Sequence, residues 1–284
     1  MTATELPSPT HIISDAHIGL APPGSGAERA LLAFLAHVES GSLLINGDLF
    51  DFWFEWRTVI PRAGFRVIAA LADLRDRGVP IVWIAGNHDC WGGDILRRDV
   101  GVDYHVGPWE GRLAGWRARV EHGDGLRPRA DRGYRAIRGV LRNPLAIRAF
   151  RWLPADLASR LATGSSQASR TYRAPEGGAG LRAVAAERLA GSDAPELLVF
   201  AHSHVATVER LAGGVYANAG AWSDDSNGPG PTYLVVTPER IELRVWSAEP
   251  HLLNALDHAV LAEKAPAGAQ EMLGRVGGDE PVGR

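Results

Sequence analysis

The feature that most constrains this sequence is a short apolar run ending in a polar side chain, which recurs along most of the chain. Short runs rich in Val, Ile and Leu are typical of strands buried within a sheet. The residue that ends each run is Asp, Asn or His, so the carboxyl ends of the predicted strands carry oxygen and imidazole donors. Five runs share this pattern: HIISDAH (11–17), LLINGD (43–48), IVWIAGNHD (81–89), ARVEHGD (118–124) and LLVFAHSH (197–204).

Helix-like segments fill the first two gaps between these runs. Residues 27–38 and 65–78 both have apolar side chains at helical spacing, and Gly78 is typical of a helix C-terminus. The number of residues between the polar ends of successive runs, from Asp15 as far as His122, fits one strand–helix–strand unit of ~30 residues or more each time. Strands that alternate with helices predict an α/β fold whose site lies at the carboxyl ends of the strands.

The gap from His122 to His202 is too long for one such unit by about one subdomain. We expect a basic, mostly helical insertion at residues 125–180, divided into short helices by Pro144 and Pro154.

The rest of the chain is predicted to form one discontinuous core domain from residues 1–124 and 181–261. Strands are expected over 214–222, 232–237 and 240–246, and the turn at Pro238-Glu239 predicts that the last two form a hairpin. Residues 262–284 are small and polar, which predicts a flexible tail.

Charge is distributed unevenly along the chain. The net charge is -3 over 284 residues, yet residues 125–173 contain eleven arginines and only Asp131 and Asp156 as acids. Such separation indicates that the insertion meets an anionic partner.

Cysteine content and the N-terminus bear on localisation. The single cysteine, Cys90, excludes an internal disulfide and is typical of a reducing compartment. The chain shows neither a secretory signal at its N-terminus nor an apolar stretch long enough to span a bilayer. We therefore expect a cytoplasmic protein or one on the cytoplasmic face of a membrane.

The polar run ends form a set of candidate metal ligands. Taken singly, Asp-x-His or His-x-His also occurs in ordinary turns, as do Gly-Asp pairs. Their joint occurrence at predicted strand ends favours a metal site. Carboxylate and amide oxygens combined with imidazole nitrogens suit first-row divalent ions, with Mn²⁺ favoured and Fe²⁺ and Zn²⁺ as alternatives. The seven candidates are Asp15, His17, Asp48, Asn87, His122, His202 and His204.

In their order along the chain, these motifs resemble those of the calcineurin-like metallophosphoesterases, with Ala201 where that family usually has glycine. The resemblance implies a β-sandwich flanked by helices, here with a helical insertion subdomain, and two divalent cations. Asp48 would bridge the two cations. One cation would be held by Asp15, His17 and His204, and the other by Asn87, His122 and His202.

The same resemblance implies roles for the neighbours of the ligands. His88 would protonate the leaving oxygen or stabilise the transition state, and Asp89 would orient His88. Asp124 would orient a ligand histidine in the same way.

A finer resemblance is to the lipid A branch of this family, whose members cleave the pyrophosphate of UDP-2,3-diacylglucosamine to UMP and the acylated sugar 1-phosphate. Residues 47–55, 122–134 and 165–170 carry it. The chain departs from that branch by one extra residue between His122 and Tyr134, and by a histidine at 88 where some members have arginine. The implied substrate contacts are Asn87, His88, Asp131, Ser166, Arg170, Arg173 and His202.

Several alternatives stay open at the level of sequence. Arginines among Trp, Phe, Leu and Ile resemble a surface that docks on an anionic membrane, but the insertion could instead pack on the core with solvated arginines. The aromatic stretch 50–56 is expected to be partly core and partly site wall. A general phosphodiesterase or phosphatase acting on nucleotides or other phosphoesters is the second enzyme hypothesis, and a non-catalytic scaffold with this fold is the third. Nucleic acid is the disfavoured partner.

Overall fold

The computed structural model describes residues 4–127, 129–159, 177–223 and 230–258, and within them the chain forms two β-sheets. The seven-stranded sheet has the order β13 (His251–Asp257), β12 (Arg240–Val245), β11 (Thr232–Val236), β2 (Thr10–Ile13), β3 (Ser42–Asn46), β4 (Ile81–Ile84) and β5 (Asp103–His105). The six-stranded sheet has the order β1 (Glu5–Leu6), β6 (Trp109–Leu113), β7 (Trp116–Val120), β8 (Leu197–Phe200), β10 (Gly214–Asn218) and β9 (Thr207–Leu211).

The two sheets pack face to face through alternate residues of their strands. Ile12, Leu44 and Val82 of the seven-stranded sheet share one buried cluster with Val120 and Val199 of the six-stranded sheet. Because successive side chains of a strand point to opposite faces, the neighbouring residues of β2, β3 and β4 point away from this interface. The result is a β-sandwich with helices on its outer faces, as the sequence predicted.

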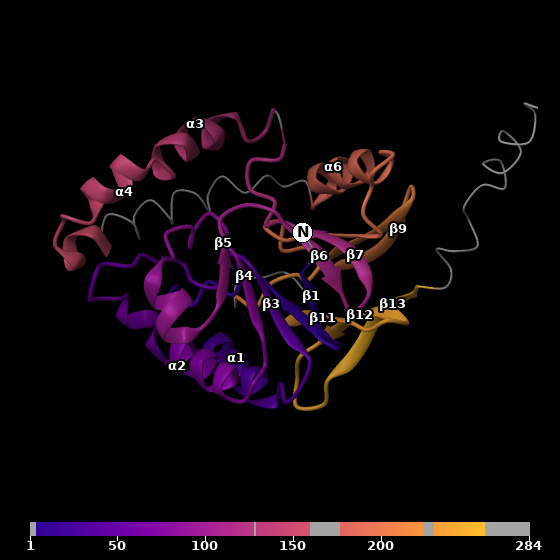
Figure 1. Cartoon of the computed structure of the whole chain (residues 1–284), viewed down its shortest axis with the longest axis horizontal. Coiled ribbons are helices and arrows are strands. Elements are labelled where there is room, and N and C mark those ends of the chain that lie inside the picture. The colour runs from indigo at the N-terminus through magenta and orange to yellow at the C-terminus, as the bar shows by residue number, and fades with distance from the viewer. Residues whose placement is uncertain (1–3, 128, 160–176, 224–229, 259–284) are drawn as a thin grey trace, which may run out of the picture.

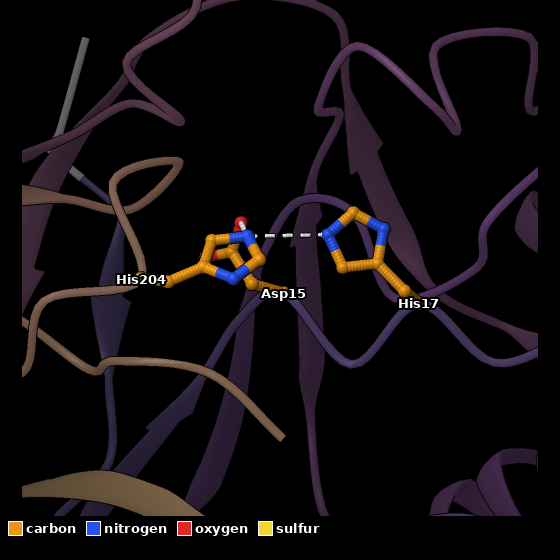
Figure 2. A group of neighbouring side chains, drawn as sticks. All are labelled: Asp15, His17 and His204. Atoms are coloured by element: carbon orange, nitrogen blue, oxygen red, sulfur yellow. Dashed lines mark hydrogen bonds and ion pairs between the residues drawn. The ribbon is translucent and has the colours of Figure 1, made fainter. Parts of the chain in front are cut away.

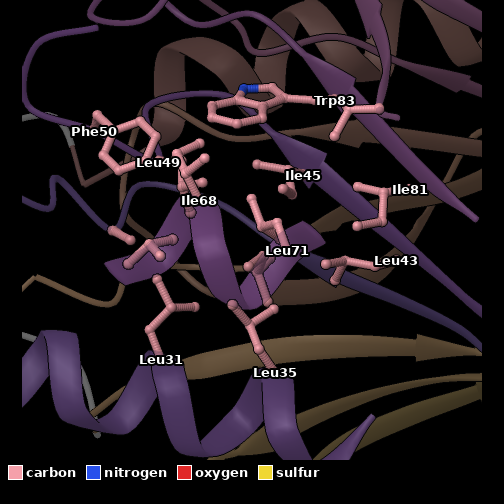
Figure 3. Close-up of a cluster of buried hydrophobic side chains, with 14 of the residues drawn as sticks. Leu31, Leu35, Leu43, Ile45, Leu49, Phe50, Ile68, Leu71, Ile81 and Trp83 are labelled. Atoms are coloured by element: carbon pink, nitrogen blue, oxygen red, sulfur yellow. The ribbon is translucent and has the colours of Figure 1, made fainter. Parts of the chain in front are cut away.

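Two helices cover the outer face of the seven-stranded sheet (Figure 1). They are α1 (Gly26–His37) and α2 (Phe65–Asp76). Their apolar stripes pack on the outward side chains of β3 and β4, as Leu31, Leu71 and Ile45 do in Figure 3. Both helices were predicted, because their apolar residues recur at helical spacing. The six-stranded sheet is covered by α6 (Ala179–Leu189), whose Leu181 and Leu189 pack on Phe200.

The described part of the predicted insertion contains two further helices, α3 (Arg132–Leu141) and α4 (Pro144–Phe150). Figure 1 shows them as a pair set apart from the sheets. Pro144 occupies the first turn of α4, where its missing N–H costs no hydrogen bond. Two shorter helical elements lie elsewhere in the chain: the 3-10 helix η1 (Arg62–Gly64) and the π-helix η2 (Ile95–Val100). The expected tail, 262–284, lies outside the described residues.

The sequence pattern did not predict every strand. The predicted hairpin is present as β11 and β12, closed by a hydrogen bond from Thr237 N to the carbonyl of Arg240. Strand β13 was missed, because its side chains are mostly exposed and show no clear apolar alternation.

Candidate metal centre

Six of the seven predicted ligands lie together, because the strands that precede them run in register within two facing sheets, and Asn87 adjoins His88 of the same cluster. Strands β2, β3 and β4 are parallel neighbours, and so are β7 and β8. Parallel neighbours end at the same edge of a sheet, and here the carboxyl edges of both sheets meet. Asp15, His17, Asp48 and Asn87 follow strands of the seven-stranded sheet, and His122, His202 and His204 follow strands of the six-stranded sheet.

The backbone at most of these positions is left-handed. The φ angles are 52° at Asp15, 46° at His17, 51° at Asp48, 63° at His202 and 60° at His204. A non-glycine residue in this region costs about 1–3 kcal/mol, so the surrounding fold must stabilise each of these turns. The turns re-aim the side chains from the strand ends toward one common point.

Asp15, His17 and His204 form one group of donor atoms (Figure 2). Nε2 of His204 lies 3.2 Å from Oδ1 of Asp15 and 3.3 Å from Nε2 of His17. These three side chains come from two sheets, since the strands before Asp15 and His204 are β2 and β8.

Asp48 is shared between two further groups of donor atoms. It lies with His17 and His88 in one and with His122 and His202 in the other, and each group gathers its donor atoms within 4.8 Å. Oδ2 of Asp48 is 3.1 Å from Nε2 of His122. This central place is the one that a bridging carboxylate requires.

The protonation states of two buried histidines, His17 and His202, favour metal binding. Burial lowers the pKa of His17 to about 3 and that of His202 to about 4, so both rings are neutral at pH 7 and offer a lone pair. Burial alone would raise the pKa of Asp15, but His204 and His122 lower it to about 2. His122 differs, because Asp48 outweighs burial and raises its pKa well above the usual range.

Several donor atoms at the site have no hydrogen bond among the described residues. The buried Oδ1 of Asn87 is one of them. Oδ1 of Asp15 and Nε2 of His122 approach neighbouring candidate ligands, but without the geometry of a hydrogen bond. Buried polar atoms are rarely left unsatisfied, so this set of oxygen and nitrogen atoms fits divalent cations.

His88 lies beside the candidate ligands and is held by Asp51. Its Nδ1 lies 2.9 Å from the carbonyl oxygen of Asp51, its backbone N–H donates to Oδ1 of Asp48, and its Nε2 lies 3.9 Å from Oδ2 of Asp48. A carbonyl only accepts hydrogen bonds, so this contact places a proton on Nδ1 and leaves Nε2 facing the site.

Asp89, which the sequence analysis paired with His88, has different partners in the structure. Its two carboxylate oxygens accept hydrogen bonds from the backbone N–H groups of Gly86 and Leu49, at 2.7 and 2.9 Å. Burial raises the pKa of Asp89 to about 7. Asp89 therefore joins the loop after β4 to the loop after β3, and Asp51 is the residue that sequence reasoning missed.

The predicted residues of the insertion are also partnered. Oδ1 of Asp131 lies 2.7 Å from Nη2 of Arg127, and Oδ2 accepts from the Arg127 backbone at 2.9 Å. Oδ2 of Asp124 accepts from the hydroxyl of Tyr134 at 2.6 Å, so Asp124 is hydrogen-bonded to a helix of the insertion. Ser166, Arg170 and Arg173 lie outside the described residues.

Sequence comparison agrees with the fold and identifies the family of the chain. The sequence model of the calcineurin-like phosphoesterases matches residues 8–206, which covers all seven ligand candidates, and the chain belongs to this family. Within it, the chain resembles proteins named UDP-2,3-diacylglucosamine hydrolase. One from Salmonella arizonae is 31% identical over 245 residues, which cover 82% of this chain and 97% of that protein.

A second relative matches a shorter stretch more closely. The UDP-2,3-diacylglucosamine hydrolase of Porphyromonas gingivalis is 38% identical over 144 residues, so the match spans 49% of this chain and only 55% of that protein. Among solved structures, the phosphoesterase Yfce from E. coli aligns at 15% identity with a TM-score of 0.47, covering 87% of this chain and 97% of that one.

Proposed function

We propose that this chain hydrolyses the pyrophosphate bond of UDP-2,3-diacylglucosamine, releasing UMP and 2,3-diacylglucosamine 1-phosphate. The observation that carries the proposal is the cluster formed by six of the seven candidate ligands, together with His88, at the meeting edges of the two sheets. The relatives in Salmonella arizonae and Porphyromonas gingivalis, which carry that substrate in their names, support the choice of substrate.

The residues that would hold two divalent cations are the seven candidate ligands, with Asp48 between the two groups. When bound, the cations would polarise the phosphoryl oxygens and lower the pKa of a coordinated water. Mn²⁺ is the proposed ion, since mixed carboxylate, amide and imidazole donors suit it, and Fe²⁺ or Zn²⁺ would fit the same donor types.

His88 is the proposed catalytic residue of the chain itself. Asp51 fixes the proton on Nδ1, so Nε2 is the ring atom that faces the phosphate. In the protonated ring, Nε2–H would donate to the leaving oxygen or to a phosphoryl oxygen. Asp89 would act indirectly, by holding the loops of Asn87 and Asp48 together.

A largely apolar pocket at the insertion supports a lipid substrate. It has a volume of about 870 Å³ and lies between the segment Trp56–Val59 and helix α4. Ile147, Trp152 and Ala155 line it, and Arg148 and Arg151 lie at the same pocket. Acyl chains gain about 0.8 kcal/mol per buried CH₂, and an arginine fork suits a phosphate. Trp56 is thus the member of the aromatic stretch that lines a wall, whereas Phe50 and Trp53 are core.

The insertion also offers a surface for a membrane. Ile137, Val140, Leu145 and Trp152 are 57%, 62%, 76% and 86% exposed, and arginines stand between them in the sequence. Exposed apolar side chains among arginines are typical of helices that lie in the headgroup region of anionic bilayers. No helix within the described ranges has the length and apolar character needed to cross a bilayer. We therefore propose peripheral attachment to the cytoplasmic face of the inner membrane.

The test is a comparison of substrates on the Mn²⁺-loaded protein. We expect kcat/KM for UDP-2,3-diacylglucosamine to exceed that for a cyclic nucleotide and for an aryl phosphate by at least about a hundredfold, because only the lipid fills the pocket. Comparable values for all three would favour the general phosphodiesterase. No hydrolysis of any of them, with metal bound, would favour the scaffold.

From the resemblance to the lipid A branch of the family, we also propose that Ser166, Arg170 and Arg173 contact the sugar and phosphate groups. Arg170→Ala should then weaken kcat/KM for the lipid substrate more than for a small chromogenic phosphodiester. An equal loss for both substrates would contradict a headgroup contact.

A further inference from the structure

Helix α3 lies next to the metal centre without being packed into the core. None of its side chains is buried, although all of its residues belong to the described part of the chain. The residues that are at least partly shielded are Tyr134, Arg138 and Leu141, together with Arg142 at its C-terminal cap. Apolar burial therefore contributes little to the position of α3, and its polar contacts decide where it lies.

Most of these polar contacts converge on Asp124. Its Oδ2 accepts from the Tyr134 hydroxyl at 2.6 Å and from Nη2 of Arg142 at 3.4 Å, and its backbone carbonyl accepts from Nη1 of Arg138 at 3.1 Å. Tyr134, Arg138 and Arg142 are four residues apart, so they form one stripe along the helix. Asp124 itself is 4% exposed, which strengthens hydrogen bonds to its carboxylate.

Asp124 is two residues from the candidate ligand His122, and the turn that follows Asp124 is shaped for the contact with α3. Gly125 has a φ of 75°, and a Cβ there would lie 3.1 Å from Nη1 of Arg138 and 3.4 Å from Cδ1 of Tyr134. A larger residue would both strain this turn and crowd the helix.

A second contact joins the far end of α3 to another ligand-bearing loop. The indole N–H of Trp91 donates to the carbonyl of Leu141 at 2.9 Å, and Trp91 lies in the loop that carries Asn87 and His88. The carbonyl of Leu141 is one of the last in the helix and has no intrahelical partner of its own. Helix α3 is thus bonded at both ends to loops that carry candidate ligands.

We propose that Asp124 is a positioning residue that fixes helix α3, and with it the pocket under α4, relative to the metal centre. Ordering of the His122 loop by metal then also orders α3, because the same loop carries the carboxylate to which α3 is bonded. The insertion is in this way held at a defined distance from the cations.

The test is hydrogen exchange of the full-length protein, read by mass spectrometry on peptides from α3 and from strands β7 and β8. Tyr134→Phe removes only the hydroxyl that bonds Asp124. We expect exchange in α3 to become about tenfold faster while β7 and β8 are unchanged, since the lost bond is to a charged acceptor. Arg132→Gln, at the exposed start of α3, is the matched control and should leave α3 unchanged. Unchanged exchange in Tyr134→Phe, or equal acceleration in the control, would overturn the proposal.

Adding Mn²⁺ tests the coupling itself. Mn²⁺ should slow exchange in α3 of the wild type, and this effect should be lost in Asp124→Ala but partly kept in Asp124→Asn, which retains an acceptor for Tyr134. Equal slowing in all three proteins would contradict a role for Asp124. No substrate enters either test, so the result is independent of the substrate proposed above, and the metal-free comparison stands even if Mn²⁺ is the wrong ion.

Discussion

Nε2 of His122 lies 3.1 Å from Oδ2 of Asp48, and this contact joins the two sheets at the site. Asp48 follows β3 of the seven-stranded sheet, whereas His122 follows β7 of the six-stranded sheet. The site therefore forms only when the two halves of the sandwich are packed together, and the Asp48 carboxylate has the most central position in it.

Asp48→Asn should lose metal and activity together, because the amide keeps the shape of the side chain but removes the negative charge that offsets cation repulsion. Metal content after dialysis, measured by mass spectrometry, should fall from about two equivalents to below one. Asp193→Asn is the matched control, since the side chain of Asp193 is fully exposed and pairs with the surface residue Arg117. Two tightly held metal ions in Asp48→Asn would contradict the bridging role.

Metal binding at pH 7 should release about one proton from His122. Asp48 raises the pKa of His122 in the metal-free protein, so this ring is protonated at neutral pH and must lose its proton to bind a cation. His17 and His202, with pKa values of about 3 and 4, are already neutral and release none. Metal affinity should accordingly fall as the pH is lowered and rise as the pH approaches the raised pKa of His122.

Calorimetric titration with Mn²⁺ in two buffers of different ionisation enthalpy measures this release directly. The apparent binding enthalpy should differ between the buffers by about one ionisation enthalpy. The same enthalpy in both buffers would show that His122 is neutral before metal binds. Asp48→Asn should also lower the pKa of His122 in the metal-free protein, which NMR titration of the imidazole can follow.

His88→Ala should keep both metals and lower turnover by roughly 10²–10⁴. We expect His88 to act on the substrate rather than as a metal ligand, and its Nε2 faces the site because the carbonyl of Asp51 occupies Nδ1. The measurements are kcat and metal content for the same preparation. His105→Ala, which removes a partly exposed histidine on β5, should behave as the wild type. Normal turnover in His88→Ala would exclude an acid or transition-state role.

Ile147→Asp should lower kcat/KM for the diacylated substrate by about 10–100-fold, because a carboxylate in the apolar pocket must be desolvated when an acyl chain enters. Hydrolysis of a small chromogenic phosphodiester should change by less than about twofold. Leu252→Asp makes a like replacement at an exposed position of β13, outside the insertion, and is the matched control. A loss that is equal for the two substrates would indicate that the pocket does not bind the acyl chains.

Much of the fold was predictable because local patterns encode it. The apolar runs before Asp15 and Asp48 are four- and five-residue strands of the central sheet, and helices α1 and α2 lie where the helical spacing placed them. The strand β13 was not predictable, since its mostly exposed side chains carry no periodic signal.

Within the site, the contacts made by backbone groups could not be predicted from the sequence. The family resemblance assigned His88 a carboxylate partner at position 89, whereas in the structure its Nδ1 lies 2.9 Å from the backbone carbonyl oxygen of Asp51. Any residue type has a carbonyl, so composition could not identify this one. The two carboxylate oxygens of Asp89 likewise bind backbone N–H groups, which no side-chain motif reveals.

The sequence by itself determined which side chains were available for metal chemistry and that they would stand at strand ends, because the alternation of apolar runs and polar ends is a local property. Only the tertiary structure decided which of them meet. The distance between Asp48 and His122, the partner of His88 and the attachment of α3 to Asp124 all depend on how two sheets and an insertion pack, and packing involves residues far apart in the chain.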